Sequence, residues 1–350
     1  MTIRFALVGC GSIAAKHVEA IARIDGASIV AVCDVQSGAA RKMGETLGVP
    51  WFTSATAMAD AVAFDVFTVL TPSGDHAAQV FDLARFGRHF VVEKPMALRI
   101  DDADRMIAAC DQSGGKIFVV KQNRYNPPIV ALRDAMVAGR LGKVVMGTVR
   151  VRWARHQAYY DQRPWRGTWA QDGGVLTNQA AHHIDMLIWL MGDVESVSAM
   201  TATRLANIEA EDTGVAILRF ASGALGVIEA TTGARPTDLE GSLSLMGEKG
   251  AVEIGGFFMN QLKTWNFVEP TAEDSRAFDR FGDTPKIPAW NLEQYLRGVI
   301  SSLKEGRAGL VDGLEGRRSL ELISAIYESA ETGRTIPLRF RPQSCRLGGV

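Results

Sequence analysis

The fold is decided near the start of the chain, by the stretch Ile3-Arg4-Phe5-Ala6-Leu7-Val8-Gly9-Cys10-Gly11-Ser12-Ile13-Ala14. A short apolar run leads into a Gly-x-Gly-x-x-Ala pattern, and a helix is expected over residues 13–24. The first glycine permits a tight turn, the second lets the backbone approach a pyrophosphate, and the small third residue lets the helix pack against the strand. The helix start offers N–H groups to phosphates. The residues expected to hold a dinucleotide here are Gly9, Gly11, Ser12 and Ile13.

An acidic residue ends the second expected strand and strengthens this prediction. Asp34 lies 25 positions after Gly9, where a carboxylate can accept hydrogen bonds from the adenosine ribose hydroxyls. The same charge would repel a 2′-phosphate, so the cofactor is expected to be NAD, with NADP less favoured. Arg41 and Lys42 lie nearby and leave dual use open.

The first 121 residues alternate short apolar runs with helical segments. Strands are expected over 3–8, 29–34, 66–70, 90–93 and 117–121, and helices over 13–24, 38–47, 76–85 and 101–112. Continuously apolar strands that alternate with helices indicate a parallel sheet covered on both faces. We therefore expect an α/β Rossmann dinucleotide-binding domain over residues 1–121.

The pattern changes after residue 121. Strands are expected over 144–153, 194–203, 214–220, 224–231, 242–246 and 251–254, and helices over 129–138, 178–191, 292–304 and 313–331. In residues 149–153 arginines alternate with apolar residues, which is typical of antiparallel strands with one wet face. We expect an α+β domain over 122–350, with a large, open, mainly antiparallel sheet and helices on one side. Its open face makes a homodimer or homotetramer a reasonable expectation.

Composition excludes several classes of function. Lys and Arg total 38 against 39 for Asp and Glu, which argues against a nucleic-acid or membrane surface. The apolar runs have strand length, and the N-terminus lacks the features of a signal peptide. Cys10, Cys33, Cys110 and Cys345 have no metal-ligand spacing. We expect reduced thiols, a cytoplasmic location and no metal site.

A Glu93-Lys94-Pro95 motif follows the fourth expected strand, where ligands bind such sheets. With this motif the chain resembles the Gfo/Idh/MocA oxidoreductases, whose Glu-Lys-Pro lysine is catalytic or orients the substrate. The resemblance spans nearly the whole chain. It implies a cofactor site that also includes Thr71, Pro72, Ser73, His76, Glu93 and Lys94.

The resemblance continues over residues 172–185, Asp-Gly-Gly-Val-Leu-Thr-Asn-Gln-Ala-Ala-His-His-Ile-Asp. The family pattern there is Gly-Gly-x-Leu-x-Asp-x-Gly-x-His-x-x-Asp. On the expected helix, Asn178, His182 and Asp185 fall on one face. Asn178 replaces the usual Asp, which removes a possible proton acceptor, although an amide can still position a hydroxyl or an N-acetyl group. Ala180 replaces a Gly, which we interpret as a packing change.

Oxidation of a secondary alcohol needs a group that takes the hydroxyl proton while a hydride leaves carbon. Histidine has an ordinary pKa near neutrality, so we assign His182 as the general base. Lys94 would hydrogen-bond the same oxygen, and Asp185 could orient the imidazole. Taken one at a time, these residues could equally be a surface lysine, a core histidine and a surface charge.

Three further stretches, residues 121–128, 161–169 and 176–179, look like the branch of the family that oxidises carbon 3 of UDP-N-acetylglucosamine or its uronic acid. In that branch the 3-keto product goes to an aminotransferase. Arginine forks match phosphates and carboxylates. The residues expected to contact the substrate are Lys121, Arg163, Arg166 and Asn178. Lys121 could equally be a surface lysine, and the arginines and their aromatic neighbours could equally belong to a wet sheet face and to domain packing.

Two alternatives stay open. One is another sugar or polyol dehydrogenase, or a keto-sugar reductase, of the inositol dehydrogenase type, because the fold is common to all of these. The other is a dinucleotide sensor without catalysis. The intact Lys94 and His182 argue against a sensor.

Overall fold

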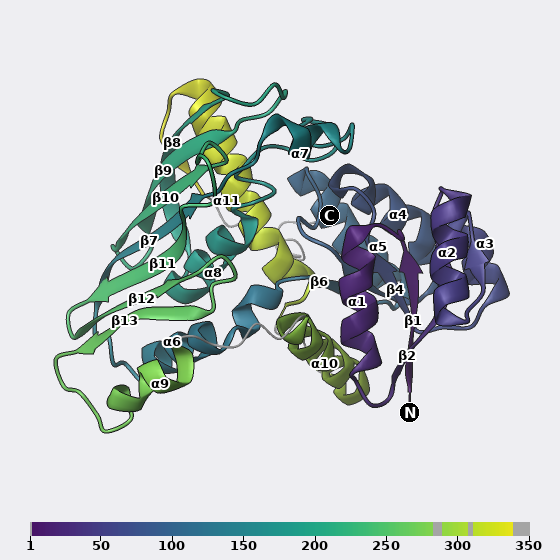
Figure 1. The fold of residues 1–350 in the computed structure, drawn as a ribbon, viewed down its shortest axis with the longest axis horizontal. Helices are drawn as coiled ribbons and strands as arrows, with labels where there is room; N and C mark the ends of the chain where they lie inside the picture. The colour runs from purple at the N-terminus through teal and green to yellow at the C-terminus, as the bar shows by residue number, and fades with distance from the viewer. Residues whose placement is uncertain (1, 283–288, 307–310, 339–350) are drawn as a thin grey trace, which may run out of the picture.

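The computed structural model describes residues 2–282, 289–306 and 311–338. These residues form two sheets, each with its own apolar core, and two long C-terminal helices lie where the two halves meet (Figure 1). No described helix has both the length and the apolar character that crossing a bilayer requires.

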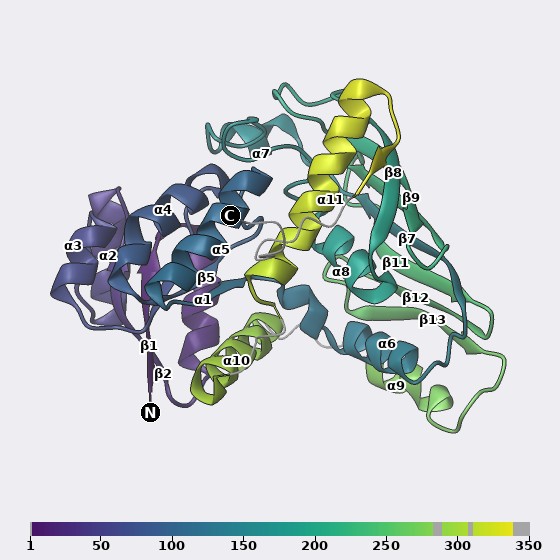
Figure 2. The same ribbon diagram turned by 180° about the vertical axis from the view of Figure 1, so that it is seen from behind.

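The first sheet is entirely parallel and has the strand order β3-β2-β1-β4-β5-β6. Its strands are β1 (Ile3–Val8), β2 (Ala27–Cys33), β3 (Trp51–Phe52), β4 (Val66–Val69), β5 (His89–Val92) and β6 (Ile117–Val119). Its helices are α1 (Ser12–Ala22), α2 (Ser37–Leu47), α3 (Ala55–Ala61), α4 (His76–Leu83) and α5 (Ile100–Ser113). Helix α1 lies on one face, and α4 and α5 lie on the other (Figures 1 and 2).

This architecture confirms the Rossmann prediction. The expected strands and helices agree with the observed bounds to within two residues. The continuous apolar runs are explained by burial, since every residue of β4 and five of the six in β1 are buried. The short elements β3 and α3 were not expected, because a two-residue strand has no periodicity to detect.

The second sheet has the order β13-β12-β11-β7-β10-β9-β8-β14, and β7 with β10 is the parallel pair in it. Its strands are β7 (Val144–Arg152), β8 (Val194–Ala202), β9 (Thr213–Phe220), β10 (Leu225–Thr231), β11 (Glu240–Gly247), β12 (Gly250–Gly255), β13 (Gln261–Phe267) and β14 (Ile336–Pro337). The helices after residue 121 are α6 (Pro127–Val137), α7 (Gln157–Asp161), α8 (Ala181–Met191), α9 (Ala277–Phe281), α10 (Trp290–Glu305) and α11 (Gly313–Thr332). The large, mainly antiparallel sheet is confirmed, and β13 and β14 are additional to the expected strands.

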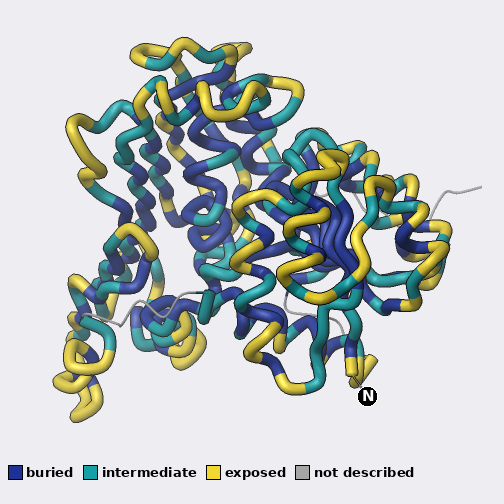
Figure 3. The backbone as a smooth tube through the Cα atoms, turned by 45° about the vertical axis from the view of Figure 1, so that its right-hand side comes forward, coloured by how far each residue is buried: buried dark blue, intermediate teal, exposed yellow. Residues whose placement is uncertain are grey.

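Helices α6, α8 and α11 cover the face of this sheet that is turned toward the first domain, and the other face lies on the outside of the molecule (Figure 1). Strand β9 shows the expected alternation. Val215, Ile217 and Arg219 are exposed, whereas Ala216 and Leu218 are buried. Figure 3 shows the buried backbone concentrated in the strands of the first sheet and in the helices beside the second.

Helix α10 packs against the first domain, although the chain reaches it only after the second sheet. Its residues Leu292, Tyr295 and Leu296 are buried in the first core, next to α1. The division into residues 1–121 and 122–350 stays a prediction, and the structure adds that α10 joins the first core. An amphipathic helix shows that one face is buried, but not which core buries it.

Candidate active site

The glycine-rich turn has the geometry that a pyrophosphate requires. Gly9 has φ +106°, and a Cβ there would lie 2.8 Å from the carbonyl carbon and oxygen of Leu70. Gly11 precedes α1, no side chain caps the helix, and a Cβ on Gly11 would meet no atom within 4 Å. Open space therefore lies before uncapped helix N–H groups that start at Ser12. These residues fit a dinucleotide phosphate.

Asp34 lies against this turn. One carboxylate oxygen accepts a hydrogen bond from the Cys10 backbone N–H at 2.8 Å, and the other accepts from the Gln36 N–H at 2.8 Å. The carboxylate is therefore fixed at the end of β2, beside the place where the dinucleotide would enter.

His76 ties the segment after β4 to the Lys94-Pro95 segment. Its Nδ1 lies 2.8 Å from the Pro95 carbonyl oxygen and its Nε2 lies 3.0 Å from that of Thr71. Burial lowers the pKa of His76, so the neutral ring donates its single N–H to one of these carbonyls. The adjoining η1 turn (Ser73–Asp75), which follows Pro72, receives Gln171 from the second domain, because the Gly74 N–H donates to the Gln171 carbonyl at 3.0 Å.

Glu93 has a buried partner that the sequence analysis missed. Its Oε1 lies 2.9 Å from Nε2 of His17 on α1. Burial alone would raise the pKa of Glu93, but the hydrogen bond and the charges of His17 and Lys94 outweigh it and lower that pKa to about 2. Glu93 is therefore an anion that holds α1 to the end of β5.

The side chain of Lys94, a residue of the first domain, reaches Asn178 in the second. Its Nζ donates to the Asn178 carbonyl oxygen at 2.9 Å and to the Asn178 Oδ1 at 3.2 Å. Burial lowers the pKa of the Lys94 ammonium, and the charges of Glu93 and Asp172 oppose that shift. Two of the predicted catalytic residues, from distant parts of the sequence, are thus in contact.

Asn178 lies in the turn before the helix and not on the helix, contrary to expectation. Helix α8 begins at Ala181, three residues later than the sequence analysis expected. The backbone carbonyl of Asn178, which would accept an intrahelical hydrogen bond, is directed at the Lys94 ammonium. The common helical face therefore includes His182 and Asp185 only.

His182 is half-buried in the first turn of α8. Burial lowers its pKa to about 3, and the charges of Lys94 and Lys121 lower it further than their anionic neighbours can offset. The ring is therefore neutral at physiological pH and can accept a proton. The pKa of His182 therefore lies well below the ordinary value from which its assignment as general base started, because burial and then two neighbouring ammonium groups lower it.

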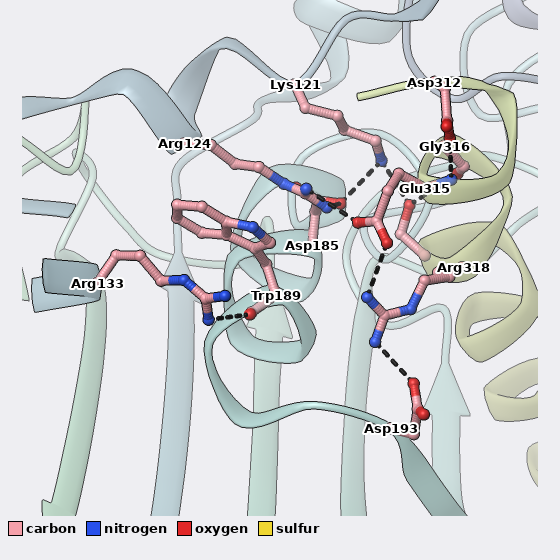
Figure 4. A network of polar contacts seen from close by, with 11 residues as sticks. Lys121, Arg124, Arg133, Asp185, Trp189, Asp193, Asp312, Glu315, Gly316 and Arg318 are labelled. Carbon is pink, nitrogen blue, oxygen red and sulfur yellow. Dashed lines mark hydrogen bonds and ion pairs between the residues drawn. The ribbon is translucent and has the colours of Figure 1, made fainter. Parts of the chain in front are cut away.

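Asp185 forms hydrogen bonds and an ion pair with cationic side chains and not with the imidazole of His182. It is buried and accepts two hydrogen bonds from Arg124, at 2.7 and 2.9 Å, while Lys121 Nζ lies 3.3 Å from its Oδ1 (Figure 4). These cations hold the pKa of Asp185 at about 2 against the effect of burial. The expectation that Asp185 orients His182 through a hydrogen bond is not met. Asp185 instead neutralises Arg124 and Lys121.

The same network continues away from the site. Arg124 also contacts Glu315 at 3.0 Å, Glu315 contacts Arg318 at 3.0 Å, and Arg318 contacts Asp193 at 2.8 Å (Figure 4). The segment after β6, helix α8 and helix α11 are thus joined by charge.

The expected substrate contacts separate into two groups. Lys121 is buried and also donates to the Ser319 hydroxyl, so its ammonium joins Asp185 on α8 to Ser319 on α11. Arg166 is half-buried, donates to the Tyr159 carbonyl at 2.6 Å, and has its guanidinium 4.0 Å from the Tyr159 ring centroid. Arg163 is exposed, and its side chain contacts no other residue of the described chain through a hydrogen bond or ion pair.

A second buried network, missed from the sequence, supports the turn that carries Asn178. Glu211 Oε1 accepts hydrogen bonds from the Leu176 N–H and the Tyr327 hydroxyl, both at 3.0 Å. The Tyr327 hydroxyl also lies 2.7 Å from Thr177 Oγ1. Asp172 adds a hydrogen bond to the Asn178 side chain at 2.7 Å. Asn178 was a usable signal, since it stands where the family pattern has an Asp and so pointed to an altered set of partners in this turn.

The described residues offer no group of three or more His, Cys, Asp or Glu side chains placed to hold a metal ion. What the arrangement offers is an ammonium donor and a neutral imidazole acceptor, brought from two domains to the carboxyl ends of the parallel strands. Such a pair can bind an alcohol oxygen and accept its proton.

Two family models match the chain. Residues 3–121 match the oxidoreductase family NAD-binding Rossmann fold (GFO_IDH_MocA), and residues 133–338 match the oxidoreductase family C-terminal alpha/beta domain (GFO_IDH_MocA_C).

The chain is similar to two solved structures of WlbA dehydrogenases, each in complex with NADH and UDP-GlcNAcA. The Bordetella pertussis enzyme is 43% identical with a TM-score of 0.90, and the match covers 97% of this chain and 100% of that one. The Chromobacterium violaceum enzyme is 42% identical with a TM-score of 0.90, with 97% of each chain covered. A D-apiose dehydrogenase of Paraburkholderia graminis is 28% identical over 340 residues, which are 95% of this chain and 89% of that protein.

Proposed function

Because the chain belongs to the Gfo/Idh/MocA oxidoreductase family, with an NAD-binding Rossmann domain, we propose that it oxidises carbon 3 of UDP-N-acetylglucosaminuronate. The parent UDP-N-acetylglucosamine is the nearest alternative substrate. The product would be a 3-keto sugar, a suitable substrate for an aminotransferase.

One observation carries this choice of substrate. The similarity to the Bordetella pertussis WlbA dehydrogenase, at 43% identity over 97% of the chain, is well above the 28% shared with the D-apiose dehydrogenase. The WlbA structure holds UDP-GlcNAcA beside NADH. The similarity to the D-apiose dehydrogenase supports a smaller sugar or polyol as the substrate instead. A sugar or polyol dehydrogenase is therefore the main alternative function.

In the proposed reaction, NAD held by the turn at Gly9 and Gly11 and by Asp34 would supply the acceptor for the hydride that leaves carbon 3. Lys94 donates a hydrogen bond to the carbon 3 oxygen and stabilises the negative charge that develops there. His182 accepts the hydroxyl proton, for which its neutral state qualifies it. Burial and the charges of Lys94 and Lys121, which keep the ring neutral, also make it a weak base. Lys94, whose pKa burial lowers, is therefore the second candidate for the proton acceptor.

Arg166 is the better supported of the two proposed arginine contacts with the substrate. Its guanidinium is held by Tyr159, and its Nε is buried without a hydrogen-bond partner in the described chain. A phosphate or carboxylate oxygen would satisfy that N–H. The contact proposed for Arg163 rests on the sequence resemblance alone.

The substrate test is the appearance of NADH absorbance with UDP-N-acetylglucosaminuronate, UDP-N-acetylglucosamine, D-apiose and myo-inositol supplied separately. We expect turnover with the uronate and the largest kcat/KM for it. Turnover with D-apiose or myo-inositol alone would contradict the proposal. Tight NADH binding with no turnover of any sugar would favour the sensor.

The residue test uses Lys94→Ala and His182→Ala. Each should lower kcat by about 10²-fold or more, because each removes a group that acts on the reacting oxygen, while the Kd for NADH changes little. Lys143→Ala, an exposed lysine on the second domain, is the matched control and should keep wild-type kcat. Near wild-type kcat in Lys94→Ala or His182→Ala would remove that residue from the mechanism.

The proposal includes a homo-oligomer, assembled through the outer face of the second sheet. Met200, Val215 and Ile217 are exposed there on neighbouring strands, with Met200 opposite Val215 in the register. We also keep the cytoplasmic location, which the free thiols of Cys10, Cys33 and Cys110 support. Cys345 lies outside the described residues.

A further inference from the structure

Lys94 has no carboxylate beside it at position 178, which raises the question of which residue supplies its negative counter-charge. The usual carboxylate at this position is an amide here, and that amide contacts Lys94 through its oxygen. The nitrogen of the same amide donates a hydrogen bond of 2.7 Å to Oδ1 of Asp172. Asn178 therefore stands between a buried ammonium and a buried carboxylate.

Asp172 is built into the turn. It is 2% exposed, and its second oxygen accepts a hydrogen bond from the Gly167 N–H at 3.0 Å. The residue that follows it, Gly173, has φ +75°. Both carboxylate oxygens are thus engaged, one by a backbone N–H and the other by the Asn178 amide, and neither is hydrogen-bonded to Lys94.

We infer that Asp172 is a positioning residue for Lys94, acting through the side chain of Asn178: it fixes the amide so that its oxygen faces the ammonium, and it supplies the negative charge that position 178 lacks. This inference rests on the proposed role of Lys94 at the reacting oxygen.

The donor and acceptor capacities of the three groups determine the direction of the hydrogen bonds from Lys94 through Asn178 to Asp172. An ammonium is only a donor and a carboxylate is only an acceptor, so the group between them must accept on one side and donate on the other. An amide does both. A carboxylate at position 178 would face Asp172 across a hydrogen-bond distance, and two carboxylates so close cannot both stay ionised.

The electrostatic surroundings agree with this geometry. Burial lowers the pKa of Lys94 and raises the pKa of Asp172, and the charge of each group opposes the shift of the other. Lys94 also faces Glu93, Lys16 and His182. The other charged and titratable groups around Asp172 are Arg166, Tyr160 and Glu211.

The test compares Asp172→Asn, Asn178→Asp and the exchange Asp172→Asn with Asn178→Asp. In the exchange, the asparagine at 172 can accept from Gly167 and donate to the new carboxylate, so every hydrogen bond is retained and the charge moves next to Lys94. Asp134→Asn, an exposed carboxylate on α6, is the control for loss of one charge.

Two readouts are needed. The first is kcat against pH with the best sugar substrate. The second is the pKa of Lys94, measured from its rate of acetylation by acetic anhydride over a pH series with mass spectrometric detection. The second needs no substrate, so it separates failure of this inference from failure of the proposed function.

We expect Asp172→Asn to lower kcat by about tenfold or more with little change in the Kd for NADH, and to lower the pKa of Lys94 by about one unit. The exchange should bring kcat back to within a few-fold of wild type and raise the pKa of Lys94 above that of Asp172→Asn. Asn178→Asp alone should lower kcat because its two carboxylates must share a proton.

An unchanged pKa of Lys94 in Asp172→Asn would overturn the inference. So would an exchange variant that binds NADH normally but is no more active than Asp172→Asn, since the exchange retains both the hydrogen bonds and the negative charge; the pKa of Lys94 distinguishes the electrostatic role of Asp172 from a merely structural one. If Asp172→Asn does not fold, the exchange variant alone decides. A pKa of Lys94 above the wild-type value in the folded exchange variant supports the inference, and a pKa below the wild-type value contradicts it.

Discussion

At the scale of single residues, the site depends on charges whose partners come from distant parts of the chain. Lys94 contacts Asn178, and Glu93 contacts His17. Each contact joins a residue at the end of a parallel strand to a residue on another element. Such sites combine groups from loops and helix starts around a rigid sheet.

Asp34 carries a prediction on cofactor choice. Asp34→Ala should reduce the ratio of NAD affinity to NADP affinity by about tenfold or more, which corresponds to about 1.4 kcal/mol. The reason is the loss of a carboxylate that accepts ribose hydrogen bonds and repels a 2′-phosphate. The measurement is titration of NADH and NADPH by fluorescence. Asp25→Ala, an exposed acidic residue of the same domain, should leave the ratio unchanged, and an unchanged ratio in Asp34→Ala would count against the ribose contact.

The site residues that belong to a recognisable motif could be predicted from the sequence. The residues that contact them and shift their pKa values could not. Lys94, Asn178 and His182 were identified by motif and come together in space. Asp185 was identified too, but its partner was misjudged, because a sequence does not show that Arg124 and Lys121 point at the same carboxylate. The low pKa of His182 has the same origin, since it depends on burial and on neighbours from other elements.

At the scale of elements, the turn between β1 and α1 depends on two glycines for different reasons. Gly9→Ala should lower the free energy of unfolding by about 2 kcal/mol or more, because a Cβ would meet the Leu70 backbone and the φ of +106° suits only glycine. Gly11→Ala should fold with near wild-type stability, because its Cβ meets no atom within 4 Å, yet lose NADH affinity. Urea unfolding and NADH titration separate the two. Equal losses of stability in both variants would refute this division.

Glu211, which supports the turn that contains Asn178, should make the free energy of unfolding depend on pH. Burial raises the pKa of Glu211 to about 7 from its ordinary value of 4.5. The folded state therefore binds a proton more tightly than the unfolded state, and stability falls as pH rises from about 4.5 to about 7. The full change is about 3 kcal/mol at most.

Glu211→Gln should remove this component. The difference in unfolding free energy, variant minus wild type, should increase by up to about 3 kcal/mol from pH 4.5 to pH 7.5. Urea unfolding over that pH range is the measurement. Histidines with lowered pKa values, such as His182 and His183, contribute with the opposite sign, but they cancel in the difference. A constant difference would show that Glu211 does not titrate in this window.

The elements themselves were predictable where periodicity is sustained. Only the start of α8 departs by more than two residues, because Lys94 binds the Asn178 carbonyl there. Strand β13 was missed because an irregular register between β12 and β13 interrupts its alternation. Such irregularities arise from pairing with another strand, which local sequence does not report.

At the scale of the whole molecule, the outer face of the second sheet predicts self-association. The side chain of Ile217 is 63% exposed on β9, near Met200 and Val215. Ile217→Asp should dissociate a wild-type dimer or tetramer into smaller species, because it places a charge in an apolar contact. Analytical ultracentrifugation measures the change. Val137→Asp, on an exposed valine of α6, should not alter the assembly, and a monomeric wild type would refute the prediction.

The return of α10 to the first core has a consequence for chain architecture. The first core contains buried residues from two separated parts of the chain, residues 3–120 and a later part in which α10 contributes Leu292, Tyr295, Leu296, Val299 and Ile300. Strands β7 to β13 lie between these two parts, and after α10 the chain returns to the second sheet with β14. A chimera that grafted only residues 2–121 onto a relative's C-terminal part would pair α1 with a foreign helix, whereas one that also carried residues 289–306 would preserve the native packing of α10 against α1.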